Sequence, residues 1–465
     1  MLLNFPFTDC QFAGTNRKSP TLAMSSLTTG SQVAITTVNQ GKLRHIGLAS
    51  FVAVLYAYCA GGPFGFEAMV STSGPGMALL FILVIPLLFS VPMALATAEM
   101  SSAMPVEGGF YRWTRAAFGD FWGFQCGWWN WTGTFLITGA YGVQLADTVA
   151  RVLPVHNRFQ HWVIAFAFIV LVGLLNFLGI RLVGMVTMVL LLLQMAPVAV
   201  FTYFGFTHAH FNPFHPWMPP DHPWREVYGV GLALGLWIYS GYEQLSTVIE
   251  EVEDPARNFP HGLAIVVPLA VISFFLPVAA ALTAAGNWQK WQTGYMVTAA
   301  RSVGGPWLQL AMFGAAAICA FILLDSTILS VTRIPFTMSE DGYLHHSLAR
   351  LNARFGTPAR AILLSVISSA VLAFWNLTQL IAIYAWLRAA TSMLTLLSLW
   401  RLRLLAPGLK RQFVVPGGTV GMAAVVLIPI SLFAWALINS DPSATKWGTG
   451  VARRRARGVF IIAST

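Results

Sequence analysis

Two short Gly-rich interruptions inside apolar runs constrain this chain more than any other feature of its sequence. The first, at 59–67, reads CAGGPFGFE and directly follows the apolar run 46–58. The second, at 237–243, reads WIYSGYE and lies inside a run that begins near Val227. Glycine lets a helix unwind and proline removes a backbone donor, so helical hydrogen bonding should lapse at both places. Such backbone is tolerated in hydrocarbon only where it is buried in protein or lines a cavity, which predicts two broken helices around an interior site.

Apolar segments make up most of the chain, which is 56% hydrophobic and only 9% charged. Segments of about 20 apolar residues, long enough to cross a bilayer, recur with short connections between them. Eleven spans are predicted, near 46–72, 77–99, 119–150, 161–180, 182–206, 227–252, 261–285, 305–332, 358–375, 377–400 and 412–439. The connections leave no room for a soluble domain, so an all-α membrane protein is expected.

The net charge of +10 alone would suggest a nucleic-acid partner, but the distribution of charge argues against one. If the N-terminus is cytoplasmic, most Lys and Arg residues fall in the cytoplasmic connections, the bias that sets membrane orientation. We therefore expect no nucleic acid, and an integral multi-pass protein of the cell (inner or plasma) membrane with its N-terminus in the cytoplasm.

Two interrupted spans in corresponding positions of two halves predict the substrate site of a secondary transporter. A half-helix that starts near Phe64 would aim free N–H groups at a substrate carboxylate. The first half of the other broken span ends near Tyr239 and Ser240, whose carbonyls would suit an ammonium group. The backbone expected to approach the ligand closely belongs to Gly61, Gly62, Pro63, Gly65 and Gly241. Helix packing alone is the alternative explanation for these glycines.

Two acids, Glu67 and Glu243, flank the breaks. Acids inside membranes are costly and are functional candidates, here for recognition of a cationic group or for carrying a coupled proton. The alternative is that Glu67 lies at a wet vestibule edge and Glu243 caps local backbone. Arg388, also inside a span, is expected to pair with an acid that the sequence does not identify. Asp325 is expected to be solvated or structural.

Several motifs occur in a fixed order along the chain and together resemble the amino acid–polyamine–organocation transporter superfamily. They are Glu99-Met100, AMPVEGGFY at 103–111, AFG at 117–119, EEVEDPARNFP at 250–260, Arg333, and EDG at 340–342 with Asn352 and 356–358. The resemblance extends from about residue 42 to 440. The run GGPFG with Glu67 is most similar to the polyamine and cationic amino acid branch.

The resemblance implies two inverted five-helix repeats with broken helices 1 and 6, plus one or two C-terminal helices. It places Trp237 at an aromatic position that relatives use to cover substrate. Polyamine-transporting relatives carry extra acids where this chain has Ile137 and Thr395, which weakens polyamine specificity. Many proton-coupled relatives carry a Lys in span five, where Met185 or Gln194 stands here.

We expect a secondary active transporter, a permease that moves amino acids by alternating access and is coupled to protons (H+). A polyamine or cationic amino acid carrier is the alternative, and a substrate-sensing homologue that does not transport is another. No enzyme activity, cofactor or metal is predicted. The expected partners are a small-molecule substrate and the lipid bilayer.

Three segments are predicted: a polar cytoplasmic N-terminus at 1–41, a transporter domain at 42–440, and a truncated or aberrant twelfth span at 441–465. Met24 is expected to be the true start, so that 1–23 would not be native. Four arginines interrupt the twelfth span, each costing about 2.5–3.5 kcal/mol near a span centre. They are Arg453, Arg454, Arg455 and Arg457.

Overall fold

The computed structural model describes residues 45–220, 223–374 and 377–438, all within one compact unit that covers 37–465. The predicted segments at 1–41 and 441–465, with Met24, lie outside the described residues. All regular elements of the described part are helices, apart from an isolated parallel bridge between Ile46 and Val252. The all-α prediction is confirmed.

The first predicted span is broken as expected. Helix α1 (Leu48–Cys59) ends before the Gly-Gly-Pro segment, and the short helix α2 (Glu67–Ser73) follows it. The second break separates α9 (Trp224–Ile238) from the 3₁₀ segment η3 (Gln244–Glu251). Both breaks thus fall where glycine and proline interrupt the apolar runs.

The other spans correspond to helices, some of them distorted, and α11 (Tyr295–Val331) is kinked at Gly305, whose φ is 81°. The second span contains α3 (Pro75–Ile85), the π-helical segment η2 (Pro86–Ser90) and α4 (Val91–Ala103). After the short helix α5 (Phe110–Phe118), the chain forms α6 (Asp120–Ala150), α7 (Arg158–Leu178), α8 (Ile180–Thr207), α10 (Pro255–Ala284), α11 (Tyr295–Val331), α12 (Arg333–Glu340), α13 (Ala359–Leu372), α14 (Leu377–Leu405) and α15 (Gly418–Ile438).

Among the described residues, six helical segments are long and apolar enough to cross a membrane, and three shorter apolar helices accompany them. Large apolar side chains are exposed on several of these helices, including Leu171 on α7, Leu192 on α8 and Leu427 on α15. Exposed leucines along apolar helices are the surface expected where a protein meets lipid.

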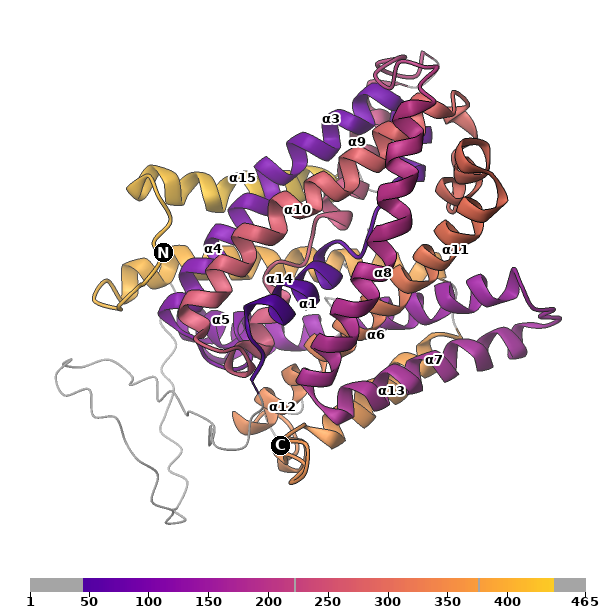
Figure 1. Ribbon diagram of the computed structural model, residues 1–465. Coiled ribbons are helices and arrows are strands. Elements are labelled where there is room, and N and C mark those ends of the chain that lie inside the picture. Colours follow the sequence, from indigo (N-terminus) through magenta and orange to yellow (C-terminus); the bar gives the residue numbers. More distant parts are fainter. Residues whose placement is uncertain (1–44, 221–222, 375–376, 439–465) are drawn as a thin grey trace, which may run out of the picture. The chain divides into compact units, whose positions relative to one another are not determined.

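Helix α1 lies in the interior of the helical bundle. It packs against α8, α10 and α11, and Figure 1 shows it between the α8 and α10 ribbons. Helices α7 and α13 also pack on each other and run side by side in Figure 1. The packing around α1 places the first break inside the protein, where its freed backbone groups can meet protein or ligand rather than lipid.

Candidate substrate site

The two breaks lie against each other. The Tyr58 hydroxyl, one turn before the first break, donates to Gln244 Oε1 across the second break at 3.4 Å. A Cβ atom added to Gly241 would stand only 2.8 Å from the Tyr58 ring. Gly241 also has a φ of 126°, which a side chain would strain. Only glycine therefore lets the second break approach the first this closely.

An amide from α8 fixes the first break. Gln194 Nε2 donates to the Gly61 carbonyl, one of the acceptors freed by unwinding. A Cβ atom on Gly62 would fall 1.9 Å from the same nitrogen. The sequence identified Gln194 only as a departure from relatives with a lysine, whereas the structure makes it a support of the unwound backbone.

Glu67 accepts a backbone N–H group of the first break, where a substrate carboxylate is expected to bind. Its Oε2 accepts the Gly65 N–H at 2.8 Å, and its Oε1 accepts the N–H of Gly294, just before α11, at 3.3 Å. The carboxyl group is buried, with 1% exposure, rather than at an open vestibule edge. Glu67 therefore ties the first break to the loop that precedes α11.

Glu243 and Arg388 form a buried ion pair across the second break. Arg388 Nη2 on α14 stands 2.9 Å from Glu243 Oε1, and the two side chains are 4% and 1% exposed. Ser392, one turn further along α14, donates to the same carboxylate oxygen at 2.7 Å. Glu243 is thus the acid that the sequence could not assign to Arg388.

Polar side chains around this pair leave unmatched hydrogen-bonding atoms. Asn130 Nδ2 on α6 donates to Gln244 Oε1 at 3.0 Å. Gln244 Nε2, Asn130 Oδ1 and Arg388 Nε and Nη1 are buried without a hydrogen-bond partner among the described residues. Buried polar groups are almost always paired in native structures, so this concentration makes the region a candidate binding site for a polar ligand.

Sequence reasoning missed Asn130 and Gln244. Asn130 begins a polar row at i, i+4, i+8 on an otherwise apolar span, with Thr134 and Thr138 as the next members. All three side chains are buried, and residues four apart share a helix face. This spacing of polar residues in the sequence could have predicted that α6 has a polar face directed into the protein.

The aromatic residues near the breaks differ in their contacts. Trp237 is half-buried and packs against a small apolar cluster that includes Ile137 on α6 and Tyr384 on α14. Tyr239 is fully buried, and its hydroxyl donates to the Ile82 carbonyl at 2.9 Å, which occupies that polar group within the protein. Phe64 is partly buried against the main core. Of the three, Trp237 is the one that bridges the helices on the α6–α14 side.

The backbone at the end of α9 is partly occupied by protein groups. The Tyr239 carbonyl accepts from the Ser90 hydroxyl at 3.3 Å, and the Ser240 hydroxyl donates to the Trp237 carbonyl at 2.8 Å. Pro63 in the other break is buried. The substrate-facing roles expected for these residues stay predictions.

Asp325 on α11 is a further buried acid. It accepts from Asn176 Nδ2 at 2.7 Å and from Thr187 Oγ1 at 3.1 Å, and it has no ion-pair partner within the described ranges. These contacts join α7, α8 and α11. They match the structural alternative for Asp325 rather than the solvated one.

At one end of the helices, acids and arginines form what we call the ionic cluster: Glu107, Arg112, Arg115, Glu250, Glu251, Arg333, Glu340 and Asp341. Arg333 Nε meets Glu251 Oε1 at 2.8 Å, and the Glu107 N–H donates to Glu250 Oε1 at 3.1 Å. Burial, with the charges of Glu251 and Glu250 nearby, raises the pKa of Glu107 well above its ordinary value. The 104–109 loop is thereby held against the end of η3.

The rest of the ionic cluster links α5 to the end of α12. Arg112 Nη2 meets Glu340 at 3.1 Å, and Arg115 Nη1 meets Asp341 at 3.0 Å. The motifs at 103–111, 250–260 and 340–342, which lie far apart in the sequence, therefore converge here. Their physical role is to lock loops from three regions of the chain together.

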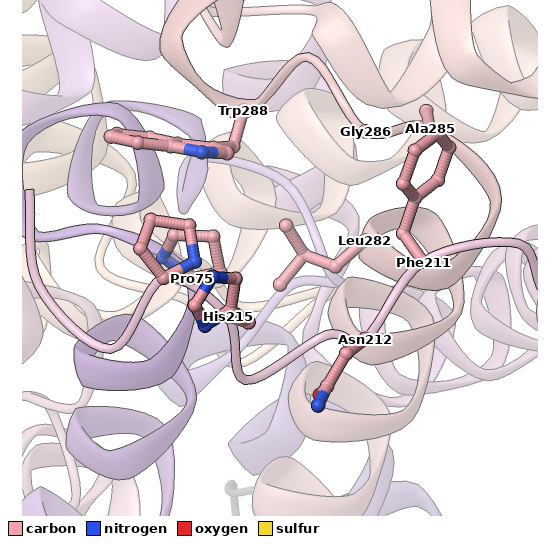
Figure 2. Close-up of a pocket in the computed structure, with 9 residues that line it drawn as sticks. Pro75, Phe211, Asn212, His215, Leu282, Ala285, Gly286 and Trp288 are labelled. Carbon is pink, nitrogen blue, oxygen red and sulfur yellow. The ribbon is translucent and has the colours of Figure 1, made fainter.

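A separate hollow of about 440 Å³ lies among the loops that follow α8 and α10. Figure 2 shows Trp288 facing Pro75 and His215 across it, with Leu282 beside them. None of the residues at 59–67 or 237–243 lines this hollow. Its position next to the connecting loops separates it from the two breaks.

Comparison with known proteins settles the family. A profile of the family described as amino acid permease matches residues 46–452. The chain belongs to the amino acid permease family. The superfamily resemblance drawn from the motifs is therefore confirmed, and the permease is a transporter of the amino acid and polyamine type rather than an enzyme.

The relatives of the permease include proteins described as transporters of two substrate classes. A probable polyamine transporter from Arabidopsis thaliana is 29% identical over 400 residues, covering 86% of this chain and 82% of that protein. A branched-chain amino acid permease from Lactococcus lactis subsp. cremoris is 26% identical over 349 residues, covering 67% of this chain and 71% of that protein.

The fold of the permease also has a solved counterpart. The crystal structure of MhsT in complex with L-phenylalanine superposes with a TM-score of 0.62, covering 86% of this chain and 99% of MhsT at 14% identity. That likeness supports the fold alone. With the breaks at α1–α2 and α9–η3, it confirms the predicted architecture of inverted repeats with broken helices 1 and 6. The permease is an integral membrane protein.

Proposed function

We propose that this permease is a secondary active transporter of amino acids that works by alternating access and is driven by a proton gradient. The observation that carries the proposal is the meeting of the two breaks beside the Glu243–Arg388 pair. Backbone at 61–65 and 239–241 would hold the α-amino and α-carboxylate groups, and Trp237 would cover them.

Alternating access needs a closure at each end that can open in turn. The ionic cluster is the closure at one end, because it ties η3 to α5 and to the α11–α12 boundary through buried ion pairs. The excess of Lys and Arg in the connections at this end favours a cytoplasmic position, with the N-terminus on the same side. We assign the protein to the inner or plasma membrane.

The two acids beside the breaks suit different roles. Glu243 is held by Arg388, so its negative charge is balanced and serves the electrostatics of substrate recognition. Glu67 has no ion-pair partner among the described residues and accepts only backbone N–H groups. A buried carboxyl group without a cation can exist in the neutral form, so we assign proton coupling to Glu67.

A polyamine or cationic amino acid carrier is the second candidate. It is favoured by the polyamine transporters among the relatives and by the GGPFG run with Glu67. A sensor that binds the same ligand without moving it is the third, and it differs from the others only in the absence of flux.

Uptake into proteoliposomes separates these candidates. Labelled neutral and basic amino acids, putrescine and spermidine are offered with and without an inward proton gradient. Gradient-stimulated amino acid uptake is the expected result. Uptake of polyamines alone would favour the second candidate. Uptake that does not depend on the gradient would exclude proton coupling. Ligand binding without uptake would indicate a sensor.

A further inference from the structure

The buried guanidinium of Arg388 is only partly matched by protein groups. One nitrogen, Nη2, is 2.9 Å from Glu243 Oε1, but none of the three guanidinium nitrogens makes a hydrogen bond with the described residues. The side chain is only 4% exposed. Leaving buried donors unpaired is costly, more so for a charged group.

We infer that Arg388 joins the backbone of the first break in binding the α-carboxylate of the transported substrate and thereby selects amino acids against polyamines. The inference rests on the proposed function and adds the residue that sets the substrate class. The planar guanidinium presents several N–H donors in a fixed arrangement, which suits the oxygens of a carboxylate. Glu243 approaches Nη2, so Nε and Nη1 are the donors left for the substrate.

The neighbours of Arg388 place this fork beside the breaks. Tyr58, at the first break, and Tyr384 lie close enough to interact electrostatically with the guanidinium. Tyr58 in turn contacts Gln244, whose Nε2 donor is unpaired. Unpaired donors therefore come from α14 and from the second break. An unpaired acceptor, Asn130 Oδ1, belongs to the α6 side chain whose Nδ2 donates to Gln244 Oε1.

The acids beside the breaks offer little to a polyamine. Glu243 is already engaged by Arg388 and Ser392. Both oxygens of Glu67 accept backbone N–H groups. A polyamine carries two or more ammonium groups and no carboxylate, so it would meet the Arg388 charge without a free acid to balance it. A zwitterionic amino acid brings the carboxylate that Arg388 lacks.

Ligand binding by purified protein tests this without requiring transport. Thermal stabilisation in detergent is measured with L-leucine, L-phenylalanine, L-lysine and L-glutamate, with the methyl esters of leucine and phenylalanine, and with putrescine. Wild-type protein is expected to bind at least one of the free amino acids. It should bind leucine or phenylalanine at least about tenfold more tightly than the matching ester, which keeps the ammonium but lacks the carboxylate charge.

Arg388→Gln is expected to abolish the preference for the free acid over its ester and to admit putrescine, because Glu243 becomes available. Arg388→Gln leaves the Glu243 carboxylate buried without its cation. The second variant therefore combines Glu243→Gln with Arg388→Gln, so that no unpaired charge is left. The double variant should also lose the acid-over-ester preference but should not gain putrescine binding. Asp147→Asn, at an exposed position, is the control and should bind as wild type does.

Three results would overturn the inference. The first is that wild-type protein binds putrescine as strongly as it binds any amino acid, and the second is that it binds no member of the panel. The third is that the double variant still prefers the free acid over its ester. Failure of the proposed function looks different. In that case the acid-over-ester preference depends on Arg388 as described, yet proteoliposomes show no uptake.

Discussion

Arg333 holds Glu251 through two contacts, Nε to Oε1 at 2.8 Å and Nη2 to Oε2 at 3.2 Å. Both side chains are buried, at 0% and 5% exposure. The pair joins the end of η3, which continues the second broken helix, to the junction of α11 and α12. A movement that opens this end of the permease must separate the pair or carry both elements together.

Removing one partner of this pair should destabilise the protein more than removing both. Arg333→Met leaves the Glu251 carboxylate buried without its cation and is expected to cost about 3–5 kcal/mol. Arg333→Met combined with Glu251→Gln should recover most of that loss, because no unpaired charge is left. Thermal unfolding in detergent measures both. Equal losses in the single and double variants would show that burying the unpaired Glu251 charge costs nothing in Arg333→Met.

Gly62 is expected to tolerate no side chain. In Gly62→Ala the new methyl group would lie 1.9 Å from Gln194 Nε2, so the amide must leave the Gly61 carbonyl that it supports. Uptake should fall at least about tenfold, with a stability loss of about 1–3 kcal/mol for overpacking. Gly314→Ala on α11, where a Cβ atom meets nothing within 4 Å, is the matched control.

The control variant should retain uptake and gain slightly in stability, since alanine favours helix more than glycine does. If Gly62→Ala transported as well as Gly314→Ala, close packing of the first break against α8 would not be required for transport.

The breaks were predictable because their causes are local. Gly-Gly-Pro at 61–63 and Gly241 interrupt helical hydrogen bonding wherever the chain places them, and the structure is non-helical there. Length and hydropathy set what crosses a bilayer, so apolar segments of that length likewise indicate candidate spans.

The partner of Arg388 could not be predicted, because it depends on which helices pack together. Glu243 and Ser392, which share a hydrogen bond, are 149 residues apart. Any of several buried acids had the right chemistry to pair with Arg388. Only the approach of α14 to the second break selects Glu243. The same holds for Glu67, whose contact with Gly294 lies 227 residues away.

Glu67→Gln should separate proton coupling from substrate binding. The amide cannot release a proton, but its oxygen can still accept one of the N–H groups from Gly65 or Gly294. We expect stimulation of uptake by an inward proton gradient to disappear, while exchange between labelled and unlabelled substrate continues. Proteoliposome uptake and exchange assays measure the two activities separately.

Glu253→Gln provides the control for that experiment, because Glu253 is an exposed acid outside the breaks. It should keep the full response to the gradient. A Glu67→Gln permease that still responds to the gradient would exclude Glu67 as the proton carrier. Attention would then turn to Asp325, another buried acid without an ion-pair partner among the described residues.

Glu107 should make the stability of the permease fall as pH rises. Its ordinary pKa is 4.5, and burial together with the charges of Glu251 and Glu250 raises the pKa of the folded state well above that value. Below the ordinary pKa, the carboxyl group is protonated in both states and its contribution to stability is fully present. As pH rises, the unfolded chain releases the proton first, so this contribution is lost progressively until the folded pKa is passed.

Glu107→Gln removes this titration while keeping a neutral side chain of the same shape. Between about pH 5 and pH 8, the free energy of unfolding, measured by thermal unfolding, should therefore fall less steeply in the variant than in wild type. The difference in slope is about 1.4 kcal/mol for each pH unit over which only the folded state holds the proton. The variant should be the more stable protein at the upper end of the range. Parallel curves would mean that Glu107 is charged in the folded state, with its charge balanced by an arginine of the ionic cluster such as Arg333.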